Sequence, residues 1–259
     1  MSRIEEAIER LGALVIDNVT ALGGFVLFLL SALLYIALPP YKPRLAIRQV
    51  RIIGAESFFL VALIAAFTGM VLGLQGYNTL RRFGSEGALG TVVALVLVRE
   101  LGPVLAALMV TARAGSAMAA EIGSMQATEQ IDALTVMAIN PIQYLVSPRV
   151  IAGVISFPLL TSIFDVIGIW GGYVIGVGLM GAPGGSYVHG IAQNLTAHDI
   201  SSGLYKALLF GLVVMWVCCY KGYHAQRMAT GVSRATTEAV VLSSVLILAW
   251  DYFLTSILL

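Results

Sequence analysis

The sequence predicts an all-α integral membrane protein, and three observations lead to this fold class. Of the 259 residues, 59% are hydrophobic and 11% are charged, whereas soluble domains carry about 25% charged residues. The mean hydropathy is +0.91. The apolar residues form long continuous runs rather than the alternating pattern of membrane β-strands, so the predicted spans are helices. The formal net charge of +1 does not indicate nucleic-acid binding, and we expect none.

The first forty residues predict a helix that lies on a membrane surface. Charged residues fall mainly on one side of this helix, and apolar residues recur at helical spacing on the other, at Ile4, Ile8, Leu11, Val15 and Val19. The apolar run continues through residues 20–38 until Pro39 and Pro40 interrupt it. That run is just long enough to cross a bilayer. Its length alone does not distinguish a span from a bent re-entrant hairpin.

Residues 41–259 form a single predicted transmembrane domain. Five apolar runs in it are long enough to span a bilayer, at about residues 57–80, 87–112, 150–181, 203–220 and 239–258. The connection at 81–86 is a tight turn, and the one at 113–149 is long and mixed in composition. The connection at 182–202 is Gly-rich and polar, without Lys or Arg.

Basic residues set the expected orientation. They gather in residues 42–51, 113–149 and 221–234, so the positive-inside rule places these three segments in the cytoplasm. Residues 182–202 and the C-terminus then lie outside. The pair Arg81 and Arg82 is an exception on the outer side, and Glu86 follows it closely.

Two ionisable residues interrupt the second predicted span. Arg99 and Glu100 each carry an insertion cost of about 2.5–3.5 kcal/mol at membrane depth. Adjacent helical residues point about 100° apart, so each side chain needs another partner or a wet cavity. Other intramembrane charges are Asp165, Lys206 and Asp251. Which of them pair is left open, and Lys206 has the alternative of snorkelling to the interface.

The residues that follow this pair favour an irregular helix, and glycines mark close helix contacts. Gly102-Pro103 predicts a kink that frees backbone carbonyls beside Glu100. Small residues recur in span three at Gly168, Gly172 and Gly176, and in span one at Gly69, Gly73 and Gly76. These sets predict either packing within the chain or a dimer seam. Neither a metal site nor a catalytic residue is expected from the spacing of His198, the other histidines and the two cysteines.

A short amphipathic helix is predicted at residues 128–140, between spans two and three. Thr128 is the expected N-cap, and Asn140-Pro141 ends the helix. Two interpretations are open: a linker helix packed on the bundle, or a docking helix for a cytoplasmic partner.

Several ordered runs make the sequence resemble the MlaE/YrbE permease family. They are GMVLGLQGY at 69–77, LVRELGPV at 97–104, ARAGSA at 112–117, ATEQI at 127–131, GIWGG at 168–172 and GVSRATT at 231–237. These matches extend from about residue 50 to the end of the chain.

The resemblance implies a homodimeric permease subunit of an ABC transporter. Such transporters move phospholipids between the inner and outer membranes of Gram-negative bacteria and maintain outer-membrane lipid asymmetry. The implied partners are a cytoplasmic ABC ATPase, a STAS-domain subunit and a periplasmic hexamer of MCE-domain proteins. The first segment would be an interfacial and elbow helix, followed by five transmembrane helices, in the bacterial inner membrane. Residues 128–140 would be the coupling helix, contacting the ATPase through Glu129, Gln130, Asp132 and Met137.

The chain lacks a G-x-x-x-x-G-K-[ST] motif, so ATP and Mg²⁺ are expected on the partner ATPase, with no cofactor or enzymatic site here. Spans one, two and five are the implied walls of an outward-open lipid pocket. The candidate lipid-binding residues are Leu72, Gln75, Leu80, Arg99, Glu100 and Lys206.

Three other functions remain as alternatives. An ion-coupled secondary transporter would use Arg99, Glu100 and Asp165 as a relay, and it predicts pseudo-symmetric halves that the sequence does not show. A membrane enzyme would need a nucleophile–base pair at depth. A permease for another lipid, such as a sterol, is the third.

Overall fold

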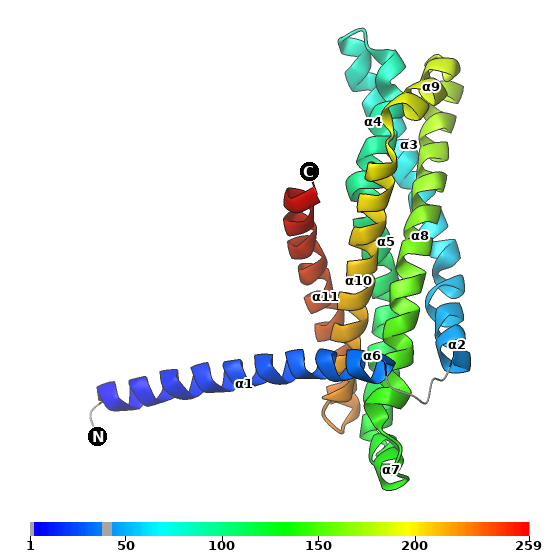
Figure 1. Ribbon diagram of the computed structural model, residues 1–259. Coiled ribbons are helices and arrows are strands. Elements are labelled where there is room, and N and C mark those ends of the chain that lie inside the picture. The colour runs from blue at the N-terminus through cyan, green and yellow to red at the C-terminus, as the bar shows by residue number, and fades with distance from the viewer. Residues whose placement is uncertain (1–2, 38–42, 259) are drawn as a thin grey trace.

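The protein folds into a helical bundle with one long helix lying across it (Figure 1). The computed structural model describes residues 3–37 and 43–258, and these contain helices and no strand. Five helical segments are long and apolar enough to cross a membrane: Pro43–Arg82, Glu86–Ala127, Ile142–Leu179, Ala197–Tyr223 and Ala229–Leu258. The prediction of an all-α membrane protein is therefore confirmed.

Helix α1 (Arg3–Ala37) runs across the bundle at the end that also carries α2 and α7 (Figure 1). It is one continuous helix, so the re-entrant hairpin is wrong, and its apolar stretch Leu22–Ile36 is shorter than a span. Trp216 Nε1 donates to the Phe25 carbonyl at 2.9 Å, and the two rings stack with centroids 3.9 Å apart. The side chains of the predicted amphipathic face at Ile4, Ile8, Leu11 and Val15 lie outside the described residues.

Span one contains α2 (Pro43–Ile53), a 3₁₀ turn and α3 (Phe58–Arg82). Arg113 of span two secures the junction between these helices. Its guanidinium donates to the Ile52 carbonyl at 3.0 Å and to Ser57 Oγ at 3.1 Å, and it pairs with Glu56 at 2.6 Å. Arg113 was expected to open a long loop. Because its charge is neutralised inside the bundle, the helix continues past it.

Span two is irregular along its length. It comprises α4 (Leu89–Val96), a π-helical turn Leu97–Leu101, α5 (Gly102–Val110), a second π-helical turn Thr111–Gly115 and α6 (Ser116–Ala127). The helix continues past the predicted span end at Ala112 to Ala127 and buries Met118 and Ile122. The irregularity expected from Gly102-Pro103 takes the form of the π-helical turn directly before it.

Span three is a π-helical turn, α8 (Ser147–Tyr173) and another π-helical turn. Its glycines meet those of α3, because a Cβ on Gly69 would collide with the Gly168 carbonyl and a Cβ on Gly73 would lie 2.7 Å from the Gly172 carbonyl oxygen. Both glycine sets thus serve packing within the chain. The backbones approach closely only because neither helix carries a side chain there.

Spans four and five are α10 (Ala197–Tyr223) and α11 (Ala229–Leu258). Helix α10 is central, because 67% of its most apolar 18-residue stretch is buried inside the protein. Only 11% of the corresponding stretch of α11 is buried. Helix α9 (Gly184–Asn194) covers the opposite end of the bundle from α7 (Figure 1). Burial raises the pKa of Tyr187 to about 12, and its hydroxyl donates to the Ile169 carbonyl at 3.0 Å, which joins α9 to α8.

Candidate functional site

Lys206 of α10 joins three spans at one point inside the bundle. Its Nζ donates to Glu100 Oε2 at 2.8 Å, to Thr255 Oγ1 at 2.7 Å and to the Arg99 carbonyl at 2.9 Å. Asp251 lies 3.2 Å from the same nitrogen. The Lys206 side chain is only 2% exposed, so the alternative that it snorkels to the interface is wrong. Each of its three N–H bonds already has an acceptor within the protein.

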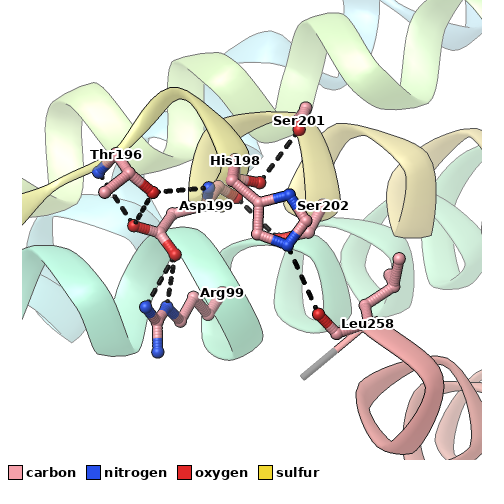
Figure 2. A network of polar contacts seen from close by, with 7 residues as sticks. All are labelled: Arg99, Thr196, His198, Asp199, Ser201, Ser202 and Leu258. Carbon is pink, nitrogen blue, oxygen red and sulfur yellow. Dashed lines mark hydrogen bonds and ion pairs between the residues drawn. The ribbon is translucent and has the colours of Figure 1, made fainter.

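Arg99 has a different partner, which the sequence interpretation missed. Its Nε and Nη2 both lie 2.7 Å from Asp199 Oδ1 (Figure 2). The other Asp199 oxygen accepts hydrogen bonds from the Thr196 backbone N–H at 2.8 Å and the Thr196 hydroxyl at 2.7 Å. Thr196 and Asp199 therefore form a capping box at the start of α10. The Thr-x-x-Asp spacing before an apolar run was the available signal.

These residues surround a polar cavity of about 180 Å³. It is lined by Arg99, Glu100, His198, Asp199, Ser202, Lys206, Thr255 and Leu258. His198 also lines this cavity, with Nε2 3.4 Å from the Leu258 carbonyl oxygen (Figure 2). Arg99 and Glu100 are 39% and 37% exposed. The cavity thus offers charges of both signs, already paired but reachable, which suits a zwitterionic or hydrogen-bonding headgroup.

The other predicted lipid-binding residues line a separate, mainly apolar cavity of about 290 Å³. Its walls, from α3 and α4, are Leu72, Gln75, Gly76, Thr79, Leu80, Val92, Val93 and Val96. The two cavities are neighbours along span two. Val92, Val96 and Arg99 follow one another at the spacing of one helix face, and all three are partly exposed. Span two therefore contributes apolar residues to one cavity and charged residues to the other, three to four positions apart.

Asp165 of α8 does not join this network. Its Oδ1 is buried without a hydrogen-bond partner and is in contact with Gly102. It lines neither cavity, so the structure does not bring together the Arg99–Glu100–Asp165 group that an ion relay would use.

At the opposite end, α7 (Gln130–Val136) is shorter than the predicted helix at 128–140. Glu129, not Thr128, precedes its first residue, with a left-handed φ of 58°, while the Thr128 hydroxyl donates to the Ser124 carbonyl. Ala138 just after the helix has φ 59°. Two non-glycine residues in this conformation make tight corners on both sides of α7.

The acidic residues of this segment are paired within the chain. Arg227, in the connection between α10 and α11, lies 2.7 Å from Asp132 and 3.5 Å from Glu129. Gln130 donates to the Thr128 hydroxyl at 3.0 Å. The α7 segment also presents apolar side chains outward beside these exposed acidic ones, since Val136 is 88% exposed and Met137, just after the helix, is 60% exposed.

The comparison with known families covers the whole bundle. The family model "Permease MlaE" matches residues 46–257. The chain belongs to the MlaE permease family. Similarity to individual MlaE-family proteins extends over nearly the full length. The chain is 46% identical to a probable ABC transporter permease protein of Rickettsia typhi, covering 92% of each chain. It is 44% identical to the intermembrane phospholipid transport system permease protein MlaE of Haemophilus influenzae, covering 97% of each.

A plant protein extends the MlaE comparison beyond bacteria. The chain is 34% identical to the chloroplastic protein TRIGALACTOSYLDIACYLGLYCEROL 1 of Arabidopsis thaliana, over 82% of this chain and 61% of the plant protein. The resemblance to the MlaE/YrbE family is thereby confirmed. The family match includes every residue of both cavities except Leu258, but excludes α1.

Proposed function

We propose that this protein is the permease subunit of an ABC transporter that moves phospholipids between the inner and outer bacterial membranes and so maintains outer-membrane lipid asymmetry. The similarity to the intermembrane phospholipid transport permease of Haemophilus influenzae supports this assignment. The observation that carries it is that span two lines both an apolar and a charged cavity, with Val96 in the first only three positions before Arg99 in the second. A phospholipid needs both surfaces side by side.

The acyl chains would lie against Leu72, Leu80 and the valines of α4, with Gln75 at the edge. The headgroup would lie at Arg99, Glu100 and Lys206. Spans one, two, four and five supply these walls. Drug-sized ligands fill about 300–1,000 Å³, so neither cavity alone encloses a diacyl lipid. A second copy of the chain would complete the enclosure as a homodimer, and the largely uncovered α11 provides apolar surface for it.

ATP and Mg²⁺ would be bound by a separate cytoplasmic ATPase, which contacts α7. The contact would use Met137 and its neighbour Val136, because both are exposed. Glu129 and Asp132 would set the position of α7 through Arg227 rather than contact the ATPase alone. Gln130 is exposed beside them. A STAS-domain subunit and a periplasmic MCE-domain hexamer would complete the assembly in the inner membrane.

Phospholipid retained by the purified complex tests this function. Val92→Trp would fill the apolar cavity, and we expect it to lower the phospholipid that co-purifies in mild detergent and its ATP-dependent transfer to acceptor vesicles. Val166→Trp is the matched control, because Val166 is 68% exposed on α8 and lines neither cavity. Mass spectrometry of the same sample identifies subunits and lipids. Equal lipid content and transfer in the two variants, or a sterol as the retained lipid, would contradict the proposal.

A further inference from the structure

A second polar cavity lies at the α7 end of the bundle, among α2, α6 and the start of α8. Its volume is about 180 Å³, and its polar walls are Arg48, Gln49, Glu121, Tyr144 and Arg149. It shares no residue with the two cavities described above. The function proposed for those cavities does not use it.

Arg149 is the buried charge of this cavity. Its side chain is only 4% exposed, with Nη2 2.8 Å from Glu121 Oε2 and Nη1 donating to the Leu145 carbonyl at 2.8 Å. Its Nε is buried and has no hydrogen-bond partner among residues 3–37 and 43–258, which the structure describes. A guanidinium has five N–H donors and no acceptor, so this side chain lacks an anion or carbonyl oxygen at one edge. A buried donor left unmatched carries a desolvation penalty that an added acceptor removes.

Arg48 supplies a second, accessible charge. It is exposed on α2 and forms no ion pair with any residue that the structure describes. The cavity is lined by two guanidinium groups and by one carboxylate, that of Glu121, so it has an excess of positive charge. Guanidinium groups match the oxygens of a phosphate in geometry as well as in charge.

The cavity lies at the depth of lipid headgroups. The segment Pro43–Arg82 has 40 residues and is about 60 Å long at the α-helical rise, whereas a bilayer with its headgroups measures about 40–45 Å. Its α2 end therefore reaches the membrane surface. Helix α1 crosses the bundle at this end (Figure 1), and Ser147, two residues before Arg149, donates to the Ala32 carbonyl of α1 at 3.1 Å. By the positive-inside rule this surface is cytoplasmic.

We propose that this cavity binds the phosphate of an anionic phospholipid from the cytoplasmic leaflet, held between Arg48 and Arg149. The lipid would be a resident one rather than transported cargo. It would connect α2 to α6 and α8. Basic pockets between membrane helices on the cytoplasmic side are suited to anionic headgroups.

Native mass spectrometry of the full complex, released from nanodiscs of phosphatidylglycerol and phosphatidylcholine, tests the proposal. Arg48→Gln should weaken retention of phosphatidylglycerol about five-fold, the effect of one basic residue near an anionic surface. Arg44→Gln is the matched control, because it removes the same charge from the same helix but does not line the cavity. An equal loss in both variants would indicate diffuse attraction to α2 and overturn the proposal, as would no loss in either.

Two further measurements separate the lipid from other occupants. Arg149→Lys keeps the positive charge near Glu121 but loses the guanidinium fork, so it should reduce phosphatidylglycerol retention and also reduce the gain in melting temperature that phosphatidylglycerol gives over phosphatidylcholine. If this variant does not fold, the Arg48→Gln comparison decides. Displacement of phosphatidylglycerol by inorganic phosphate would assign the site to free phosphate. A photo-crosslinker at Gln49 that captures a protein subunit instead of lipid would assign it to a partner chain. Either result overturns the proposal.

Discussion

At the scale of single residues, the one positive charge of Lys206 lies beside two negative charges. Glu100 and Asp251 lie 2.8 Å and 3.2 Å from its Nζ, and Thr255 fills the third position. Asp251 Oδ1 has no hydrogen bond, because the three donors of Lys206 are directed at other acceptors. The lysine is therefore the group on which the contact among spans two, four and five depends.

Lys206→Met should lower the free energy of unfolding by about 3–5 kcal/mol, since it leaves two carboxylates near the bundle interior without their cation. Lys221→Met is the control. Lys221 pairs with Glu238 at a partly exposed position, and such pairs contribute about 1 kcal/mol or less. Both variants are heated in detergent, and the fraction of folded protein that remains is measured by gel filtration at each temperature.

A second comparison separates a structural pair from a lipid contact. If Glu100→Lys abolishes transport and Lys206→Glu restores it in the double variant, the pair is structural. If Glu100→Gln keeps the complex assembled but changes lipid content, the charge contacts the lipid path. Unaltered folding, lipid content and transport in Arg99→Ala and Glu100→Ala would contradict both interpretations.

Asp165 and Gly102 should be energetically coupled. A Cβ at position 102 would collide with Asp165 Oδ1, so we expect Gly102→Ala to destabilise the protein by about 1–3 kcal/mol through overpacking. Asp165→Ala in the same chain should recover part of that loss, with a coupling energy of about 0.5–3 kcal/mol. Strictly additive effects in a double-mutant cycle of thermal unfolding would show that the close contact does not determine stability.

Sequence reasoning at this scale recognised which residues needed partners but not which partners they have. Adjacency on a helix excludes an Arg99–Glu100 pair, and each residue indeed has a separate partner. The choice of Asp199 over Asp165 depends on how α8 and α10 are rotated against span two, which no local pattern encodes. Asp199 was overlooked because it lies outside the predicted apolar run, although its capping-box spacing was visible.

At the scale of elements, the hydrophobic pattern located five apolar helical segments, and each of these segments is longer than the apolar run that predicted it. Span two was predicted to end before Arg113 because a charge usually marks the membrane surface. Glu56, Ser57 and the Ile52 carbonyl instead satisfy that arginine from a neighbouring span. A prediction made from the charges of one segment cannot identify an ion-pair partner that lies on a different segment. The glycine motifs were informative about close packing, yet only the fold assigned them to α3 and α8.

The contact between these two helices should tolerate no added methyl group. Gly69→Ala would push against the Gly168 carbonyl, so we expect a loss of about 1–3 kcal/mol in unfolding free energy. Gly178→Ala, in the π-helical turn that follows α8, has nothing within 4 Å of the new Cβ and serves as the control. Equal melting temperatures for the two variants would refute close α3–α8 packing.

Helix α7 should contact its ATPase through apolar rather than acidic side chains. Met137→Asp places a charge on the exposed tip of this segment, and we expect the ATPase subunit to be lost from the purified complex while the permease still inserts. Phe83→Asp is the control, because Phe83 is also an exposed apolar residue but lies at the opposite end of the bundle. Unchanged assembly and ATPase activity in Met137→Asp would show that α7 is a linker helix and not a docking site for the ATPase.

At the scale of the whole molecule, the two ends of the bundle differ in charge. One end carries α1, α2, α7 and the Arg227 connection, and the other carries α9 and the Arg81–Arg82 turn. The first end is the more basic, although Arg113 and Arg149 now belong to helices rather than to a loop. The orientation prediction therefore depends on fewer exposed basic residues than the sequence suggested, mainly those of α2 and residues 221–234.

Cysteine labelling tests this orientation directly. The native Cys218 and Cys219 are fully buried, so a membrane-impermeant maleimide should not label them. A cysteine at Gly185, where the Cβ meets nothing within 4 Å, should react in intact spheroplasts, while one at Gln226 should react only after the membrane is opened. Labelling of Gln226→Cys in intact spheroplasts would show that the protein has the opposite orientation in the membrane. In that arrangement α7 would face away from ATP and the Arg48 cavity would face the outer leaflet, so the coupling through Met137 and the cytoplasmic lipid site would both be wrong.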